Sequence, residues 1–196
     1  GKTEAEIVAE LEYNLKINGS EGLSFDTMVL TGPRTSLLHG KPGRNKLEKG
    51  DLLLFDFGAL YNGYHADMSR VFLVGGINQK QKELYDIVLN AQISSLESIK
   101  DGVPVKKADE IVRKTIPEDY IQYYYPGLGH GVGLEIHEQP FIKNSSDFTF
   151  QTNMTLTIEP GVYIPGWGGL RIEDTVVVRN ESVEILTQFP KDLMVL

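Results

Sequence analysis

The stretch Leu52–Val74 reads LLLFDFGALYNGYHADMSRVFLV, and it predicts a β-hairpin. Two apolar runs, Leu52–Phe57 and Met68–Val74, flank a segment that contains an Asn-Gly pair, which is typical of a tight turn between antiparallel strands. Asp56 interrupts the first run, and Asp67 directly precedes the second. We therefore expect the hairpin to bring these two carboxylates close together.

A second stretch repeats this arrangement near the end of the chain. Met154–Glu159 predicts a buried strand that ends in a carboxylate, and a turn rich in Pro and Gly follows over Pro160–Gly169. Leu170–Val178 is then expected as one strand that carries Glu173. The order of helices and hairpins, rather than residue identity, suggests two related halves.

Capping and stop signals predict three helices between these strands. The remaining segments alternate without a low-complexity tract or an obvious linker, so we expect one compact α+β unit. The predicted elements are helices from Thr3 to Gly19, from Asn78 to about Lys100 and from Pro104 to Ile116, a strand at Thr27–Leu30, a loop over Gly32–Gly50, and strands beyond Tyr125.

Composition excludes several classes of protein. The chain has 196 residues, of which 41% are hydrophobic and 23% charged, and no apolar run approaches the roughly 20 residues of a membrane helix. The net charge of -8 argues against nucleic acid as a partner. The absence of cysteine excludes disulfides, thiolate zinc sites and cysteine nucleophiles, and it fits a cytoplasmic location.

Four carboxylates and one imidazole each interrupt an apolar or glycine-rich stretch. Taken singly, each acid is more often an ion-pair or turn residue, and the histidine could belong to a core or a turn. Together they suit a site for two divalent cations, which needs bridging and terminal carboxylates. Oxygen donors with one imidazole favour Mn, Co, Fe or Zn, and we expect manganese. The residues are Asp56, Asp67, His130, Glu159 and Glu173.

The motifs resemble those of the pita-bread metallopeptidases, which include methionine aminopeptidase, aminopeptidase P and prolidase (Xaa-Pro dipeptidase). The resemblance spans nearly the whole chain. It implies the pita-bread (creatinase/aminopeptidase) fold, with two pseudo-symmetric α/β halves around a curved antiparallel sheet. The motifs are Thr31–Pro33, His39–Gly40, Asp56–Gly58, Gly63–Tyr64, Asp67–Arg70, Gly129–Leu134, His137–Glu138, Ile158–Gly161 and Gly169–Asp174.

The resemblance also implies a role for each metal ligand. Asp56 would chelate one ion, and Asp67 and Glu173 would bridge both. His130 and Glu159 would hold the other ion. Because every ligand position is filled, an active hydrolase is expected, in which a water activated by the two ions attacks the scissile carbonyl.

Further residues are expected to assist this reaction. Glu159 is the expected proton shuttle, and His39 and His137 are expected to face the substrate, where they would stabilise the oxyanion and assist the leaving nitrogen. Arg171 could balance the carboxylates or contact a substrate carboxylate. Glu135, Glu138 and Asp174 are expected as supporting or surface acids.

The subfamily follows from the spacing of the motifs. The short interval from Glu159 to Glu173, and Pro42 close to His39, resemble prolidases, so the expected substrate is a short peptide with proline in second position. Pro126 stands where many proline peptidases carry another histidine, which leaves the fine substrate contacts open. The alternatives are aminopeptidase P or methionine aminopeptidase activity, a creatinase-like enzyme, and a catalytically silent binding module.

The chain opens directly in a helix start, whereas prolidases and aminopeptidases P carry an N-terminal domain ahead of that helix. We therefore expect residues 1–196 to form a single catalytic domain of a longer protein. The N-terminal domain of that protein is expected to be missing from this chain. The full-length protein is expected to be a homodimer. The isolated domain is expected to bind metal but to turn over substrate poorly.

Overall fold

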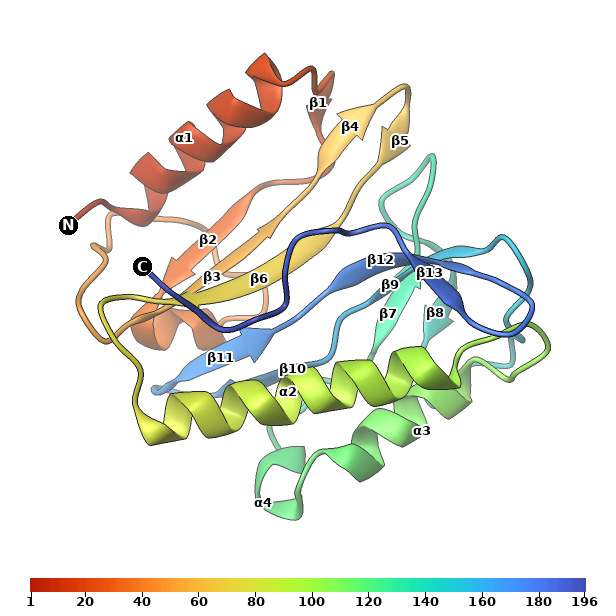
Figure 1. Ribbon diagram of the computed structural model, residues 1–196. Coiled ribbons are helices and arrows are strands. Elements are labelled where there is room, and N and C mark those ends of the chain that lie inside the picture. Colours follow the sequence, from red (N-terminus) through yellow and green to blue (C-terminus); the bar gives the residue numbers. More distant parts are fainter.

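A computed structural model describes residues 1–196 and contains helices and strands in an α+β arrangement (Figure 1). The helices are α1 (Glu4–Ile17), a 3₁₀ turn (Gly32–Ser36), α2 (Gln79–Ser98), α3 (Lys106–Thr115) and α4 (Glu118–Ile121). The strands are β1 (Gly22–Leu23), β2 (Met28–Thr31), β3 (Leu52–Phe57), β4 (Ala59–Tyr61), β5 (Tyr64–His65), β6 (Met68–Leu73), β7 (Gly129–Gly131), β8 (Glu138–Ile142), β9 (Thr155–Ile158), β10 (Gly161–Ile164), β11 (Gly168–Arg171), β12 (Asp174–Val178), β13 (Val183–Ile185) and β14 (Met194–Val195).

The hairpin predicted from Leu52–Val74 is present and forms the centre of the first sheet, whose order is β14-β6-β3-β2. β3 and β6 are antiparallel, and Asp56 lies opposite Ser69. The segment between β3 and β6, which was expected to be a turn, also contains the paired strands β4 and β5. Only Asn62 and Gly63 form the reversal, and both have positive φ, of 50° and 75°, as a type I′ turn requires.

The second sheet has the order β13-β12-β9-β7-β8, and β10 and β11 form a separate antiparallel pair. Two predictions are corrected here. Pro160–Gly169 is not one turn, since β10 occupies its first part. Leu170–Val178 is not one strand, because β11 ends at Arg171 and β12 begins at Asp174, where the chain passes from one sheet to the other. Glu173 therefore lies in the joint between the two strands.

The three predicted helices are present, with ends that differ by a few residues. Thr3 and Glu6 form the expected capping box of α1. Asn78 caps α2 in the same way with Gln81, and α2 ends at Ser98 rather than near Lys100. The short α4 was not predicted, because its four residues are too few for a periodic pattern.

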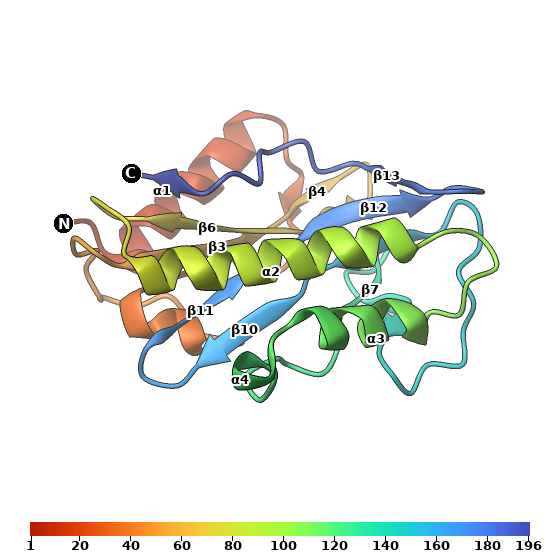
Figure 2. The same cartoon turned by 60° about the horizontal axis from the view of Figure 1, so that its bottom comes forward.

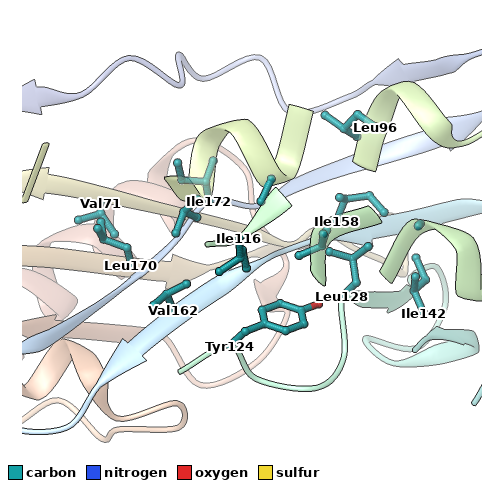
Figure 3. Close-up of a cluster of buried hydrophobic side chains, with 14 of the residues drawn as sticks. Val71, Leu96, Ile116, Tyr124, Leu128, Ile142, Ile158, Val162, Leu170 and Ile172 are labelled. Atoms are coloured by element: carbon teal, nitrogen blue, oxygen red, sulfur yellow. The ribbon is translucent and has the colours of Figure 1, made fainter. Parts of the chain in front are cut away.

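Helices α2 and α3 lie side by side and cover the same side of the strands, whereas α1 packs against β2 at the other side of the molecule (Figures 1 and 2). The main core fills the space under α2 and α3, where Leu96, Ile116, Leu128 and Ile158 meet (Figure 3). Each of these side chains is less than a tenth exposed, and burying one contributes roughly 1.5–3 kcal/mol. No helix is long and apolar enough to cross a membrane.

The end of the chain extends the first sheet at its edge. β14 pairs in parallel with β6, and the carbonyl of Leu196 accepts a hydrogen bond from Gly75 N at 2.8 Å. Tyr85 of α2 donates from its hydroxyl to the carbonyl of Lys191 at 3.0 Å. This segment therefore joins the edge of the sheet to the helix layer.

Candidate metal centre and substrate cavity

A cavity of about 950 Å³ opens between the two sheets and the loop after the 3₁₀ turn. Its walls come from α1, β2, β3, β7, β8 and the segments that flank them. Met28 and Ile142 belong both to the hydrophobic core and to the cavity wall, so the core supports the cavity directly. All residues predicted for the site line it: His39, Asp56, Asp67, His130, His137, Glu159, Arg171 and Glu173.

The first sheet supplies Asp56 and Asp67. Asp56 is held near the end of β3, and Asp67 directly precedes β6, so the hairpin register brings both carboxylates to one end of the strand pair. Asp67 is buried. Its backbone carbonyl accepts a hydrogen bond from the Thr175 hydroxyl at 2.8 Å, which fixes this corner against the second sheet.

The second sheet supplies His130 and Glu159. His130 lies in β7, and Glu159 directly follows β9. The backbone N of Glu159 donates to the Leu128 carbonyl at 2.8 Å. Nε2 of His130 lies 3.3 Å from Oε1 of Glu159 and 3.6 Å from Oδ2 of Asp67. Nδ1 of His130 lies 2.9 Å from the carbonyl of Gly131, which it can donate to, so that Nε2 is left free to bind a ligand.

Glu173 lies in the joint between β11 and β12, and residues of β6 hold it from two sides. Its backbone N donates to the Ser69 carbonyl at 3.2 Å, and its Oε2 accepts from the Ser69 hydroxyl at 2.7 Å. Arg70 donates to its backbone carbonyl. Ligand atoms of Asp67, His130 and Glu173 all lie within 4.8 Å of one another.

Arg171 is the buried cation of the cluster. Its Nε donates to the Ser69 hydroxyl at 2.7 Å, its Nη1 donates to the Tyr163 hydroxyl at 2.8 Å, and its Nη2 forms an ion pair with Asp56. Arg171 and Glu173 both line the cavity. They do so although the chain breaks between β11 and β12, so that the two residues do not lie on one face of a continuous strand. Every nitrogen of this guanidinium is therefore engaged within the protein.

The electrostatics of the cluster are dominated by burial and mutual repulsion. Burial, followed by the charges of Asp56 and Glu159, raises the pKa of Asp67 to about 8. Burial also raises the pKa of Glu173 well above its ordinary value. Burial also tends to raise the pKa of Glu159, but the hydrogen bond with His130 and the charge of Arg171 outweigh it. The pKa of Glu159 is therefore lowered. One arginine does not neutralise these acids.

The cluster fits divalent cations. Oδ1 of Asp56 and Oε1 of Glu173 are both buried, and neither has a hydrogen-bond partner. Buried carboxylate oxygens without partners are costly unless a cation or a proton compensates them. The donor set of carboxylates and one imidazole is the kind that Mn, Fe, Co and Zn accept. The residues thus have both the donors and the excess negative charge that a cation site needs.

His39 and His137 stand at the mouth of the cavity, where both side chains are exposed. The His137 ring makes an edge-on contact with the His130 ring, at 4.4 Å between centroids. Partial burial, together with the charge of His130, lowers the pKa of His137. His137 is therefore neutral at pH 7, with one N–H to donate and one nitrogen to accept.

Glu4 is a residue of this region that the sequence did not reveal. It lies in the first turn of α1 and is fully buried. Its carboxylate accepts from the backbone N of Thr31 at 3.0 Å, from Nε of Arg34 at 3.0 Å and from the backbone N of Gly43 at 2.8 Å. These bonds anchor both ends of the loop that carries His39. Its position beside a capping box concealed it, because acids in a first helical turn are common.

Ser69 and Tyr163 were also missed as partners of the cluster. Ser69 could have been found by counting the hairpin register, since it lies opposite Asp56. Tyr163 gave no such signal, because β10 was expected as part of a turn. Asp174, expected as a supporting or surface acid, is fully buried and holds Arg70 at 2.6 Å. Of the other two acids, Glu138 accepts from the backbone N of Glu135 at 2.9 Å.

Comparison with known proteins gives consistent matches. The Xaa-Pro dipeptidase of Pyrococcus furiosus is 45% identical over 195 residues, which cover 99% of this chain and 56% of that protein. The crystal structure of an X-Pro aminopeptidase from Thermotoga maritima has a TM-score of 0.97 and 43% identity, with 100% of this chain and 56% of that one covered. The prolidase structure from Pyrococcus horikoshii has a TM-score of 0.96 and 44% identity, with 99% and 56% covered.

The chain thus spans about half the length of the relatives that it matches. The family match itself extends over residues 1–180, which include every residue of the cluster and its cavity. The pita-bread fold and a requirement for divalent metal ions accompany this family. The chain belongs to metallopeptidase family M24.

Proposed function

We propose that this chain is the catalytic part of a peptidase that hydrolyses the bond before proline in Xaa-Pro dipeptides or short peptides. The observation that carries the proposal is the convergence of Asp67, His130 and Glu173, whose ligand atoms lie within 4.8 Å of one another at the base of a large cavity. The similarity to Xaa-Pro dipeptidases supports the choice of substrate. A silent binding module would not need this set of donors.

The ligands proposed for two divalent ions, with manganese preferred over Co, Zn or Fe, are Asp56, Asp67, His130, Glu159 and Glu173. Bound ions of this kind lower the pKa of water and polarise a carbonyl group. Oδ1 of Asp56 has no partner and would be free to bind a cation, while Oδ2 keeps its ion pair with Arg171. Glu173 likewise has Oε1 free while Ser69 holds Oε2.

Glu159 is proposed to move the proton. Its lowered pKa keeps the carboxylate ionised at neutral pH, so it can accept a proton from the attacking water. Thr157 donates from its hydroxyl to Oε1 of Glu159 at 3.2 Å and fixes its orientation. A quarter of the Glu159 side chain remains exposed in the cavity, which leaves it access to the leaving nitrogen.

His39 and His137 are proposed to contact the substrate from the mouth of the cavity. A neutral His137 can donate its N–H to the developing oxyanion, because its pKa is lowered. His39 approaches from the loop that Glu4 anchors. Of the two roles considered for Arg171, we propose the counter-charge of the carboxylates, which agrees with its ion pair to Asp56.

The wider organisation of the protein is also a proposal. We infer that residues 1–196 act as one catalytic domain of a longer, cytoplasmic, homodimeric protein, in line with the partial coverage of the relatives. The two pseudo-symmetric halves around a curved sheet remain a prediction. It is supported by the repeated order of a strand, a hairpin segment and a carboxylate in β3 to β6 and in β9 to β12.

A hydrolysis assay tests the proposed activity. The protein is first freed of metal with a chelator and then loaded with Mn²⁺ or Co²⁺. It is assayed with Xaa-Pro dipeptides, longer Xaa-Pro peptides and Met-peptides. We expect the dipeptides to be cleaved fastest. Cleavage of only the longer Xaa-Pro peptides would instead assign an aminopeptidase P, and cleavage of Met-peptides a methionine aminopeptidase. No cleavage by the metal-loaded protein, alone or joined to the preceding domain, would contradict the peptidase assignment.

Aminopeptidase P activity is the second candidate. The cavity of about 950 Å³ lies at the upper end of the range of about 300–1,000 Å³ that drug-sized ligands occupy, so it has room for more than two residues. The structural similarity to an X-Pro aminopeptidase points the same way. What separates the two activities is how the site treats the C-terminal carboxylate of the substrate.

A further inference from the structure

A dipeptidase must recognise a carboxylate that a longer peptide does not place at the same position. In an Xaa-Pro dipeptide the C-terminal carboxylate belongs to the residue directly after the scissile bond. Discrimination against longer peptides therefore requires a cation near the reacting carbonyl that has no acidic partner of its own. The Lys and Arg side chains that line the cavity are Lys41, Lys143 and Arg171.

Arg171 is not available for this task. Its Nε, Nη1 and Nη2 are engaged by Ser69, Tyr163 and Asp56, and its side chain is only 4% exposed. A carboxylate that bound there would have to displace Asp56 from a buried ion pair, which is costly. Recognition of the substrate carboxylate therefore falls to a lysine.

Lys143 lines the same cavity as the proposed metal ligands. It directly follows β8, in which Ile142 pairs with Gly129, the neighbour of His130. The register between β7 and β8 is shifted by a bulge, which brings this end of β8 alongside the ligand histidine. Lys143 forms no ion pair, and its Nζ lies 6.0 Å from the centre of the Phe141 ring.

Phe141 and Lys143 together form a patch that suits proline. Pro140 and Ile142 are buried, whereas Phe141 and Lys143 are exposed, and both of these exposed residues line the cavity. Phe141 is 37% exposed, so it offers an apolar surface to a pyrrolidine ring. An ammonium group next to that surface is placed to meet the carboxylate of the same residue.

We propose that Lys143 binds the C-terminal carboxylate of the substrate while Phe141 packs against its proline ring. This inference rests on the proposed Xaa-Pro peptidase function and assigns the residue that favours dipeptides. Lys41 is the other cation without an acidic partner. It lies in the loop that carries His39, and its backbone carbonyl accepts a hydrogen bond from Arg34. It serves as the matched control.

The test compares Lys143→Met and Lys41→Met in the chain loaded with Mn²⁺, with Ala-Pro and its C-terminal amide as substrates. For the unaltered protein we expect a lower KM for Ala-Pro than for the amide. Lys143→Met should raise the KM for Ala-Pro about tenfold, as expected for the loss of a charged hydrogen bond. It should leave kcat and the KM of the amide nearly unchanged, and Lys143→Arg should restore the preference.

Several outcomes would overturn the proposal: no preference for the free acid in the unaltered protein, a preference that survives in Lys143→Met, or one that disappears in Lys41→Met. Failure of the proposed function has a different signature, namely no hydrolysis of either compound by the metal-loaded protein. In that case calorimetry measures the binding of Ala-Pro and its amide. The same pattern is then expected in Kd, and equal Kd values for acid and amide in the unaltered protein would refute the role of Lys143.

Discussion

Arg70 and Asp174 form a buried ion pair in which Nη2 of Arg70 donates to Oδ1 of Asp174 at 2.6 Å, and neither side chain is more than 3% exposed. The same arginine donates to the carbonyls of Glu173 and Phe189. Lys191 approaches the other oxygen of Asp174 at 2.8 Å. The pair thus joins the backbone of a proposed metal ligand to the C-terminal segment.

We expect Arg70→Met to lower the free energy of unfolding by about 3 kcal/mol, because Oδ1 of the buried Asp174 loses its only charged partner while Lys191 stays at Oδ2. Urea denaturation of the metal-free protein measures the loss. The comparison is Arg179→Met, which removes the exposed pair with Glu184 and should cost no more than about 1 kcal/mol. Equal losses in the two variants would show that the buried pair adds nothing to stability.

Asp67→Ala is expected to abolish hydrolysis and to weaken the uptake of both ions, since it removes a proposed bridging ligand. Calorimetric titration with Mn²⁺ of the chelated protein measures the uptake independently of activity. Asp147→Ala alters an exposed acid outside the cavity and should bind metal normally. Retained turnover in Asp67→Ala would refute the assignment of the site.

The metal-free protein should lose stability as the pH rises towards 8. The pKa of Asp67 is raised to about 8 in the folded chain, from an ordinary value of 3.8. The folded state therefore holds a proton that the unfolded state releases, and the stabilisation that is complete below pH 4 declines up to pH 8. Thermal unfolding in chelator between pH 5 and 8 measures the decline.

Two comparisons separate the contribution of Asp67 from that of the other acids. Asp67→Asn should show a shallower fall in Tm over the same range. Added Mn²⁺ should raise Tm more at pH 8 than at pH 5, because metal binding competes with protons for the same oxygens. A Tm of the variant that follows the unaltered protein at every pH would be inconsistent with the raised pKa.

Arg171→Met should destabilise the metal-free protein by about 3–5 kcal/mol, because Asp56 loses its counter-charge inside the cluster. Mn²⁺ should restore part of this loss, since a cation then compensates the carboxylate. Denaturation with and without metal measures both effects. Arg44→Met serves as the control, because Arg44 is exposed and forms no ion pair, and a similar loss there would exclude a specific role for Arg171.

Glu4→Gln is expected to raise the KM for dipeptides while the stoichiometry of metal binding stays unchanged, because Glu4 anchors the loop of His39 but touches no proposed ligand. The matched variant Glu6→Gln alters only the capping box of α1, which is worth about 1 kcal/mol. Steady-state kinetics and metal titration of both variants decide the matter. A KM equal to that of Glu6→Gln would show that the loop is held by other contacts.

Much of the fold could be predicted because its signals are local. The hairpin of β3 and β6 and the capped helices α1 and α2 follow from apolar runs, Asn-Gly and capping boxes that lie within a few residues. The strand break before Glu173 could not be predicted in this way. It arises because β11 pairs with β10 whereas β12 pairs with β9. This change of partner depends on contacts between segments that are separated in sequence.

The same distinction applies to the site. Asp56 and Glu159 stood out because charges in apolar strands need a compensating partner, and the structure places both in one cavity. Glu4 and Tyr163 gave no such signal, because an acid in a first helical turn and a tyrosine near Pro and Gly are ordinary. Their partners come from distant segments, which spacing along the sequence does not reveal.

The proposed ligands are divided between the two sheets: Asp56 and Asp67 belong to the first, and His130 and Glu159 belong to the second. Cations held by all of them would cross-link the two sheets, which are also connected by side-chain contacts and by the joint at Glu173. Occupancy would then govern rigidity as well as chemistry. Amide exchange at the ends of β3 and β7 should slow together when metal is added.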